Sequence, residues 1–261
     1  MTVNTQHKDR FNELNACVLI PTYNNGKTLN QVIDSVFSYT DNVIVVNDGS
    51  TDNTHKILEG YGDILHVISY QKNKGKGFAL KTGFKIARNL GFNYVISIDS
   101  DGQHYASDLP VFIETVEKHP NSLVIGSRVL KHDNMSKGST FANRFSNFWF
   151  TVQTSMKLPD TQSGYRAYPL NKMGNMPIWS NRYEAELEIL VFSAWRRIKI
   201  VPVSISVYYA PPSEKISHFN PIKDFTRISI LNTLLVFTSI LYGYPAMAVR
   251  YIVSLFVDEK K

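Results

Sequence analysis

The chain has 261 residues, of which 43% are hydrophobic and 19% are charged. This composition excludes disordered, collagen-like and low-complexity proteins, and the length allows one large domain or two small ones. The single cysteine, Cys17, excludes an internal disulfide framework and a zinc site built from several cysteines. The net charge of +6 is compatible with anionic lipid or phosphorylated small molecules, but no basic run with interleaved aromatic residues favours nucleic acid.

The first half of the chain alternates short apolar segments, rich in β-branched residues, with segments of helix length. We expect buried strands at 16–21, 43–47, 64–70, 94–99 and 123–127, and helices between them at 28–38, 51–61, 77–90 and 107–119. Strands and helices that alternate at this spacing form βαβ units. The pattern therefore predicts an α/β fold in which helices cover both faces of a parallel sheet.

Polar, glycine-rich or acidic residues occur at the end of each predicted strand. In chain order they read PTYNN, DGSTD, NKGKG, DSDGQH and SR. The carboxyl ends of parallel strands lie at one edge of a sheet, where open α/β sheets bind their ligands. One such cluster is ordinary turn chemistry, but clusters at all these strand ends predict a binding site.

Two carboxylates, Asp99 and Asp101, bracket one residue at the end of the fourth predicted strand. Mg²⁺ and Mn²⁺ prefer such hard oxygen ligands and keep coordination positions for substrate phosphates. Gln103 would add a carbonyl oxygen. The alternative is an acidic turn that caps the next helix, and we favour the metal site.

Asp48 directly follows the second predicted strand, and we expect it to accept hydrogen bonds from a nucleobase or a ribose. Ser50, Thr51 or Asp52 would cap the following helix. After the third strand, Lys76 lies in a glycine-rich turn at a predicted helix N-terminus, where it would approach a diphosphate. The alternative for this turn is a glycine loop with solvated lysines.

The second half of the chain has fewer clear signals. The polar segment 160–166 contains Gln162, Ser163 and Gly164, which would line a sugar pocket. Glu184 and Glu186 open a helix predicted at 183–197. Carboxylates in a first helical turn also complement the helix dipole, so a contact with substrate is the less favoured interpretation of these glutamates.

The two ends of the chain differ in character. Residues 1–15 are polar and mixed in charge, and we interpret them as an extension without a secretion signal. Residues 228–249 carry no charge and are flanked by Arg227 and Arg250. This is about the length of a membrane span, but polar residues and Gly243-Tyr244-Pro245 interrupt it. Of the alternatives, a span, a buried helix or an interfacial helix, we favour the interfacial helix.

The motifs IPTYNN, VVNDGSTD, NKGKGFAL, SIDSDGQH and GSR, in this order and spacing, resemble a family 2 glycosyltransferase of the GT-A fold. The resemblance covers about residues 16–210. Within that family, DSDGQH, GSR and DTQSGYRAY are similar to the polyprenyl-phosphate branch, the dolichyl-phosphate mannose and glucose synthases. Ser163, Tyr165 and Arg166 stand where the glucose synthases have Cys, Phe and Lys.

The resemblance implies a Rossmann-like, mostly parallel sheet in a GT-A domain at 16–212, followed by an amphipathic, membrane-associated helical segment at 213–261. It also implies roles for individual residues.

The nucleotide sugar would be held by Pro21, Thr22, Tyr23, Asn24, Asp48, Lys76 and Asp99. A Mg²⁺ or Mn²⁺ ion would be held by Asp99, Asp101 and Gln103. The acceptor phosphate would be held by Ser127, Arg128 and Arg144, and Asp101 and Arg128 would be the main catalytic residues. Arg suits a phosphate because its planar fork can bond two oxygens at once.

These expectations lead to three hypotheses. The first is an inverting, metal-dependent transferase that moves a hexose from a UDP- or GDP-linked sugar to a polyprenyl phosphate at the cytoplasmic face of a membrane, as a peripheral or monotopic protein. The second is a transferase that acts on a hydroxyl of a glycan or glycolipid, for which Glu184 or Glu186 would serve as general base. The third is a non-catalytic nucleotide-sugar-binding protein, which the intact pair of aspartates disfavours.

Overall fold

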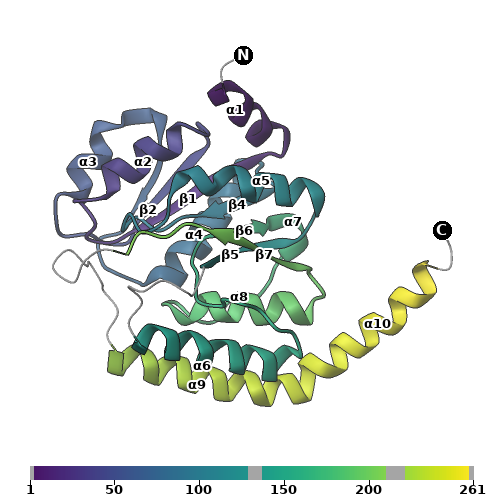
Figure 1. Cartoon of the computed structure of the whole chain (residues 1–261). Helices are drawn as coiled ribbons and strands as arrows, with labels where there is room; N and C mark the ends of the chain where they lie inside the picture. The colour runs from purple at the N-terminus through teal and green to yellow at the C-terminus, as the bar shows by residue number, and fades with distance from the viewer. Residues whose placement is uncertain (1–2, 129–136, 210–220, 259–261) are drawn as a thin grey trace.

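The computed structural model describes residues 3–128, 137–209 and 221–258 (Figure 1). The strands are β1 (Ala16–Thr22), β2 (Val43–Asn47), β3 (His66–Ser69), β4 (Tyr94–Ser97), β5 (Leu123–Arg128), β6 (Arg166–Pro169) and β7 (Ile200–Ile205). The helices are α1 (Val3–Glu13), α2 (Leu29–Phe37), α3 (Thr54–Gly60), α4 (Lys76–Asn89), α5 (Leu109–Lys118), α6 (Lys137–Thr154), α7 (Leu170–Met173), α8 (Glu184–Trp195), α9 (Pro221–Thr238) and α10 (Tyr244–Asp258). Two 3-10 turns, η1 (Gly62–Ile64) and η2 (Ala106–Asp108), and a π-helical turn, η3 (Ser239–Gly243), complete the described elements.

The predicted strands and helices of the first half are all present, with small shifts at their ends. The expectation that every strand is buried is wrong for β3, whose residues are largely exposed. The strand order is β3-β2-β1-β4-β6-β5-β7, so β3 is an edge strand with one neighbour. An edge position leaves one side of a strand without a partner, which explains the exposure.

The sheet is mostly parallel, as the resemblance implies. β1 runs parallel to β2 and β4, β2 to β3, and β5 to β7. The sequence pattern did not predict β6, which lies antiparallel between β4 and β5. Because both neighbours oppose β6, they point the same way, and the carboxyl ends of β1 to β5 meet at one edge of the sheet.

Apolar side chains pack on both faces of the sheet, because successive residues of a strand point to opposite sides. Helices α1, α2 and α5 cover one face, which contains Val18 and Ile96. Helices α4 and α8 cover the other face, which contains Leu19 and Val95. Most of the segment expected to be a polar extension forms α1, whose Phe11 is buried against the first face.

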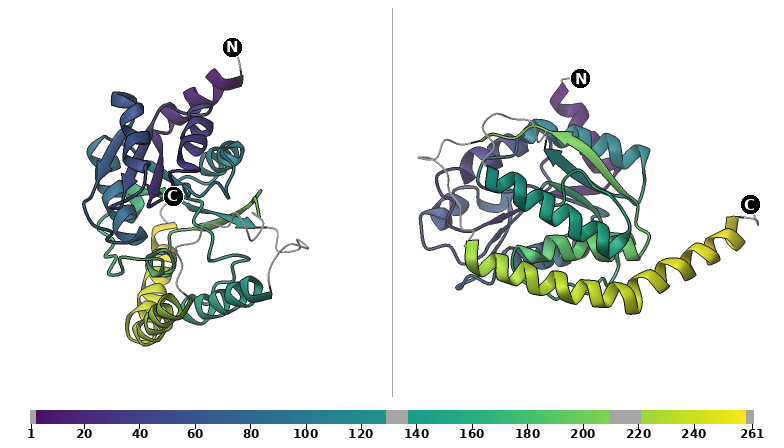
Figure 2. Two further views of the ribbon diagram at one scale, coloured as in Figure 1. Left: turned by 90° about the vertical axis from the view of Figure 1, so that its left-hand side faces the viewer. Right: turned by 60° about the horizontal axis from the view of Figure 1, so that its bottom comes forward.

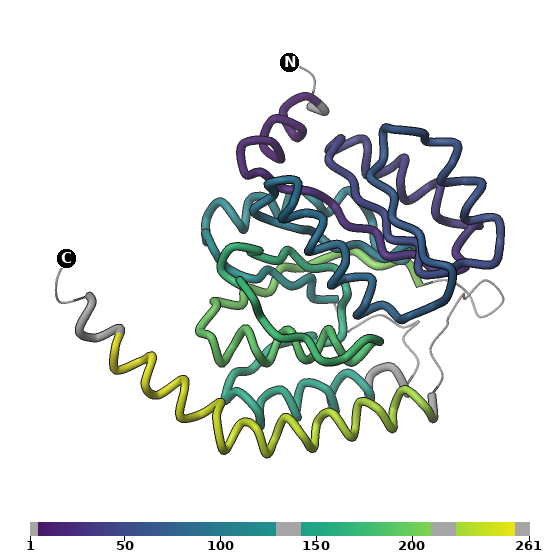
Figure 3. Tube along the Cα trace, turned by 180° about the vertical axis from the view of Figure 1, so that it is seen from behind, coloured from purple at the N-terminus to yellow at the C-terminus, as the bar shows by residue number. Residues whose placement is uncertain are grey.

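Helices α6 and α9 lie side by side below α8 and form a second helical layer (Figures 1 and 2). A buried hydrogen bond joins them, since Gln153 Nε2 donates to Asn232 Oδ1 at 2.9 Å. The Trp195 indole on α8 donates to the Gln153 carbonyl at 2.8 Å. Beyond this layer, α10 continues from α9 and projects away from the domain (Figure 3).

Candidate functional site

The turns after β1, β2 and β4 are tied to one another by side-chain hydrogen bonds. The Ser100 hydroxyl donates to the Pro21 carbonyl at 3.1 Å, and Asn25 Nδ2 donates to Ser100 Oγ at 2.8 Å. Asn24 Oδ1 accepts the Thr51 N–H at 2.7 Å. These bonds bring the predicted nucleotide-binding segment, Pro21 to Asn24, beside the acidic turn. Thr22 is buried there, and Tyr23 is half-buried.

The Asp48 carboxylate is buried and fixes the turn that follows β3. Its two oxygens accept the backbone N–H groups of Lys74 and Gly75, at 2.8 and 2.7 Å. Burial raises the pKa of Asp48, although these two donors oppose the shift. Asp48 therefore already holds the loop that leads to Lys76, and any bond to a base or ribose would use the remaining lone pairs. The predicted cap at Ser50, Thr51 or Asp52 is wrong, since the N-cap of α3 is Asn53, but Asp52 accepts the N–H of Thr54 at 3.0 Å just before the helix.

Lys76, at the first turn of α4, forms a charge cluster with carboxylates from two other elements. Its Nζ lies 2.6 Å from Asp99 Oδ1 and 3.1 Å from Glu186 Oε1, the latter without hydrogen-bond geometry. Burial alone would raise the pKa of Asp99, but the neighbouring positive groups, Lys76 foremost, together hold that pKa below its ordinary value. Gly164 closes the cluster, because a Cβ atom there would lie 2.5 Å from Nζ.

The acidic turn after β4 presents a second carboxylate, Asp101. Burial and the neighbouring Asp99 charge raise the pKa of Asp101 to about 6. One of its oxygens accepts the Gln103 N–H at 3.0 Å. Within the described residues, no group of three or more His, Cys, Asp or Glu has the arrangement of a complete metal site. Two crowded carboxylates and an amide oxygen do fit a divalent cation whose other ligands come from substrate phosphates.

His104 follows this turn, and its side chain, 8% exposed, lies against the ring of Tyr165 with centroids 5.3 Å apart. Its Nδ1 lies 4.0 Å from Asp99 Oδ2 and has no hydrogen-bond partner among the described residues. Burial lowers the pKa of His104 to about 4, so the ring is neutral at pH 7. It adds no positive charge to the acidic turn.

Arg128, at the end of β5, is paired with Asp160, a fully buried residue that the sequence analysis did not single out. Arg128 Nε and Nη2 donate to the two Asp160 oxygens at 2.6 and 2.9 Å. Asp160 also accepts bonds from Asn143 Nδ2 on α6 and from the Gln162 N–H, at 2.7 and 3.0 Å. One edge of the guanidinium fork is thus turned toward Asp160. Nη1 is the guanidinium nitrogen that does not donate a hydrogen bond to Asp160.

A second arginine, Arg166, organises the segment expected to line a sugar pocket. It is fully buried and donates to the carbonyls of Ser163, Glu186 and Thr161, at 2.7, 2.5 and 2.9 Å. These bonds clamp the loop containing Gln162 to the first turn of α8. A lone arginine in a polar segment carries no sequence signal for such a role.

The other predicted site residues are only partly brought together. Ser127 precedes Arg128 on β5 and is half-buried, whereas Arg144 is exposed on α6. The structure shows no hydrogen bond that joins Arg144 to the cluster within the described residues. Glu184 opens α8, and its Oε2 is buried without a hydrogen-bond partner in the described part of the chain. The segment that follows Arg128, residues 129–136, lies outside the described residues.

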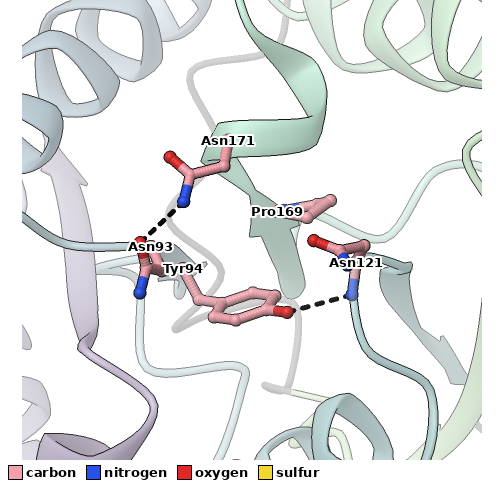
Figure 4. Close-up of a pocket in the computed structure, with 5 residues that line it drawn as sticks. All are labelled: Asn93, Tyr94, Asn121, Pro169 and Asn171. Atoms are coloured by element: carbon pink, nitrogen blue, oxygen red, sulfur yellow. Dashed lines mark hydrogen bonds between the residues drawn. The ribbon is translucent and has the colours of Figure 1, made fainter.

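A cavity of about 130 Å³ lies at the opposite end of β4 (Figure 4). Its lining residues are Asn93, Tyr94, Asn121, Pro169 and Asn171. Its polar groups bond one another, since Asn171 Nδ2 donates to Asn93 Oδ1 and the Asn121 N–H donates to Tyr94 Oη. It contains none of the strand-end residues, so it is separate from the site described above.

Residues 17–171 match the family described as Glycosyl transferase family 2. Among curated proteins, the chain is 28% identical over 214 residues to a UDP-N-acetylglucosamine–dolichyl-phosphate N-acetylglucosaminyltransferase of Methanococcus voltae, covering 74% of this chain and 85% of that protein. It is 26% identical to a human dolichyl-phosphate β-glucosyltransferase, covering 72% of this chain and 66% of that protein. Among solved structures, glucosyl-3-phosphoglycerate synthase of Mycobacterium tuberculosis, with Mn²⁺ and UDP, superposes with a TM-score of 0.66 at 18% identity, covering 91% of this chain and 84% of that one. This last likeness concerns the fold alone.

Proposed function

We propose that this chain, which belongs to glycosyl transferase family 2, transfers a hexose from a nucleoside-diphosphate sugar to a polyprenyl phosphate. That it is a glycosyltransferase follows from the family and from its relatives. The observation that carries the donor half of the proposal is the meeting of Asp48, Lys76, Asp99 and Asp101 at one edge of the sheet. The third hypothesis, a non-catalytic binding protein, is not pursued, because the relatives are transferases.

On the donor side, the turn at Lys76 would face the diphosphate, with the N-terminus of α4 directed at its charge. Asp99, Asp101 and Gln103 would hold Mg²⁺ or Mn²⁺. The ion supplies positive charge that stabilises the nucleoside-diphosphate leaving group. Direct displacement at the anomeric carbon would invert its configuration.

On the acceptor side, a phosphate is already ionised at pH 7 and needs orientation more than a strong base. Arg128 is suited to this because Asp160 fixes its guanidinium, which leaves Nη1 to meet a phosphate oxygen. Fixing the side chain in advance lowers the entropy lost on binding. Ser127 and Arg144 would add contacts from the strand and from α6.

The membrane partner is supported by the outer face of α9 and η3. Leu231 and Leu235 are buried against the domain, whereas Leu234, Phe237 and Leu241 are 54%, 64% and 81% exposed. The stretch Lys223–Val253 is long and apolar enough to cross a membrane, and it is the one such helix within the described residues. Its inner face, however, contains Asn232 in a buried hydrogen bond to α6.

A helix with one face packed on the protein and the other apolar and exposed is typical of interfacial attachment. We therefore propose that residues 213–261 dock the domain 16–212 flat on the membrane, as a peripheral or monotopic protein at the cytoplasmic face. The acceptor phosphate would then be presented at the membrane surface, close to the site.

A second candidate acceptor is a hydroxyl group, and one observation favours it. Glu184 Oε2 is buried and has no hydrogen-bond partner among the described residues, as a general base awaiting a substrate hydroxyl would be. Glu186, in contrast, is paired with Lys76. Glu186 Oε1 also lacks a hydrogen-bond partner among the described residues, but it lies 3.1 Å from the Lys76 ammonium, so Glu184 is the candidate base of the two.

The proposal is tested with radiolabelled UDP- and GDP-sugars in the presence of Mn²⁺. These donors are offered to polyprenyl phosphate and, in parallel, to the free polyprenol of equal chain length. Labelled lipid from the phosphate alone supports it, whereas labelled lipid from the polyprenol alone supports the hydroxyl acceptor. The variants separate the same alternatives. Arg128→Lys keeps the charge but loses the fork and should raise the KM for the phosphate acceptor, whereas Glu184→Gln should abolish transfer only to a hydroxyl.

A further inference from the structure

Lys76 lies against one oxygen of Asp99, a residue proposed to hold the divalent cation. The ammonium is 2.6 Å from Asp99 Oδ1, and the two side chains are 15% and 25% exposed. Glu186 approaches from α8 at 3.1 Å and is 9% exposed. The cluster therefore has one ammonium and two carboxylates in a site largely shielded from water.

The space around the ammonium is closed on the side of the sugar-pocket loop. A Cβ atom at Gly164 would lie 2.5 Å from Lys76 Nζ, 2.8 Å from Asp99 Oδ2 and 2.9 Å from Glu186 Oε1. The Gly164 carbonyl is held by the Ser97 hydroxyl at 2.6 Å. This bond anchors the loop beside the ammonium and the Asp99 carboxylate, so a second cation on this side of Asp99 would have to displace the loop or the ammonium.

Two cations at one carboxylate repel each other strongly in a poorly solvated site. A divalent ion on Asp99 and the ammonium at its present distance are therefore mutually unfavourable. A nucleoside diphosphate changes this balance, because its oxygens offer the ammonium a new anionic partner at the N-terminus of α4.

We propose that Lys76 is the internal counter-ion of Asp99 in the donor-free enzyme and moves to the donor diphosphate when the site is loaded. The proposal rests on the proposed donor site. It implies that Lys76 suppresses binding of a divalent cation by itself and makes cation and nucleotide bind cooperatively. Lys76 thereby sets the order of loading as well as contacting the donor.

The test compares binding of Mn²⁺ alone, followed by the electron paramagnetic resonance of the free ion, in the wild type, Lys76→Met and Lys85→Met. Lys85 is exposed on the same helix, so its variant matches the change in charge. We expect Lys76→Met to bind Mn²⁺ at least about tenfold more tightly than the other two, since a like charge beside the ligand is removed. Equal or weaker binding by Lys76→Met would overturn the proposal.

Lys76→Arg separates charge from packing. It keeps the cation and should bind Mn²⁺ as weakly as the wild type, and tight binding by this variant would contradict the proposal. Calorimetry with UDP and GDP in the presence of Mn²⁺ should show the reverse effect, a loss of at least about tenfold in nucleotide affinity in Lys76→Met. If the wild type binds neither nucleotide, the proposed function fails, whereas the comparison with Mn²⁺ alone still reports on Lys76.

Discussion

The two halves of the site hold their charged groups in different ways. In the donor half, Asp48 and Asp101 lie in the turns after β2 and β4, and backbone N–H groups of Lys74, Gly75 and Gln103 fix them. In the acceptor half, Arg128 is fixed by the Asp160 carboxylate, and Arg166 is fixed by carbonyls of the loop at 161–163 and of α8. The donor half therefore fixes these carboxylates through main-chain turns, whereas the acceptor half depends on a buried pair of oppositely charged side chains and on an arginine clamp.

Asp101→Ala tests the donor half and should have the largest effect. Loss of a carboxylate from the proposed cation site should reduce kcat/KM by about a thousandfold, equivalent to several kcal/mol of transition-state stabilisation. The protein should remain folded, because the side-chain hydrogen bond of Asp101 within the described residues is to the turn that contains it. The measurement is transfer from the labelled donor, with Asp63→Ala, at an exposed position, as the control. Full activity in Asp101→Ala or in excess chelator would contradict the metal role.

Arg128→Ala should show that the acceptor half combines function with stability. Removal of the guanidinium leaves Asp160, which is fully buried, without its charged partner. We expect the free energy of unfolding to fall by about 3 kcal/mol. Urea denaturation measures this, and Arg144→Ala on the exposed face of α6 should change stability by less than about 0.5 kcal/mol. An unchanged denaturation midpoint in Arg128→Ala would mean that the pair does not stabilise this half.

Arg166→Lys should destabilise the protein although the charge is kept. An ammonium cannot reach the three carbonyls that the guanidinium bonds, and a charged hydrogen bond contributes about 2 kcal/mol. The same exchange at exposed Arg144 is the matched control. If both variants unfold at the same urea concentration, the clamp on the 161–163 loop is not important for stability.

Leu241→Glu probes the outer face of the helical layer below the acceptor half. Leu241 is 81% exposed, so the change should leave stability intact and weaken binding to anionic vesicles by about tenfold, through loss of apolar area in the interface. Ile64→Glu, at a 63% exposed position in η1, is the matched control. Sedimentation with vesicles gives the comparison, and equal binding by both variants would argue against docking through this face.

The smallest expected effect is a pH dependence of stability. Burial would raise the pKa of Asp160, but the Arg128 charge outweighs it and holds that pKa below its ordinary value of about 3.9. The contribution of the Asp160 carboxylate to the free energy of unfolding is therefore complete above about pH 4. It is lost as the pH falls through the pKa that Asp160 has in the folded protein. The difference in unfolding free energy between the wild type and Asp160→Asn should shrink between pH 7 and pH 3. A difference that is independent of pH would contradict this.

Much of the donor half could be predicted from the sequence, because each element there has a local cause. β-branched runs form the buried strands. A residue that follows such a strand lies at the binding edge of the sheet, and this position depends on the strand itself and not on residues distant in sequence. The exposure of β3 could not be predicted, because a strand at the edge and one at the centre have similar local patterns. Likewise, β6 could not be predicted, because it is four residues long and follows a polar loop. Such a short segment shows no clear alternation of apolar and polar residues.

By itself, the sequence determined the α/β fold, the order of the strand-end motifs and the family. Tertiary structure decided which charges meet. It paired Arg128 with Asp160 across 32 positions and placed Lys76 between Asp99 and Glu186. It also decided that one face of α9 is buried and the other exposed. The reason is physical: hydrogen-bonded periodicity is a local property of the chain, whereas the partner of a charged or apolar side chain depends on residues that are distant in sequence.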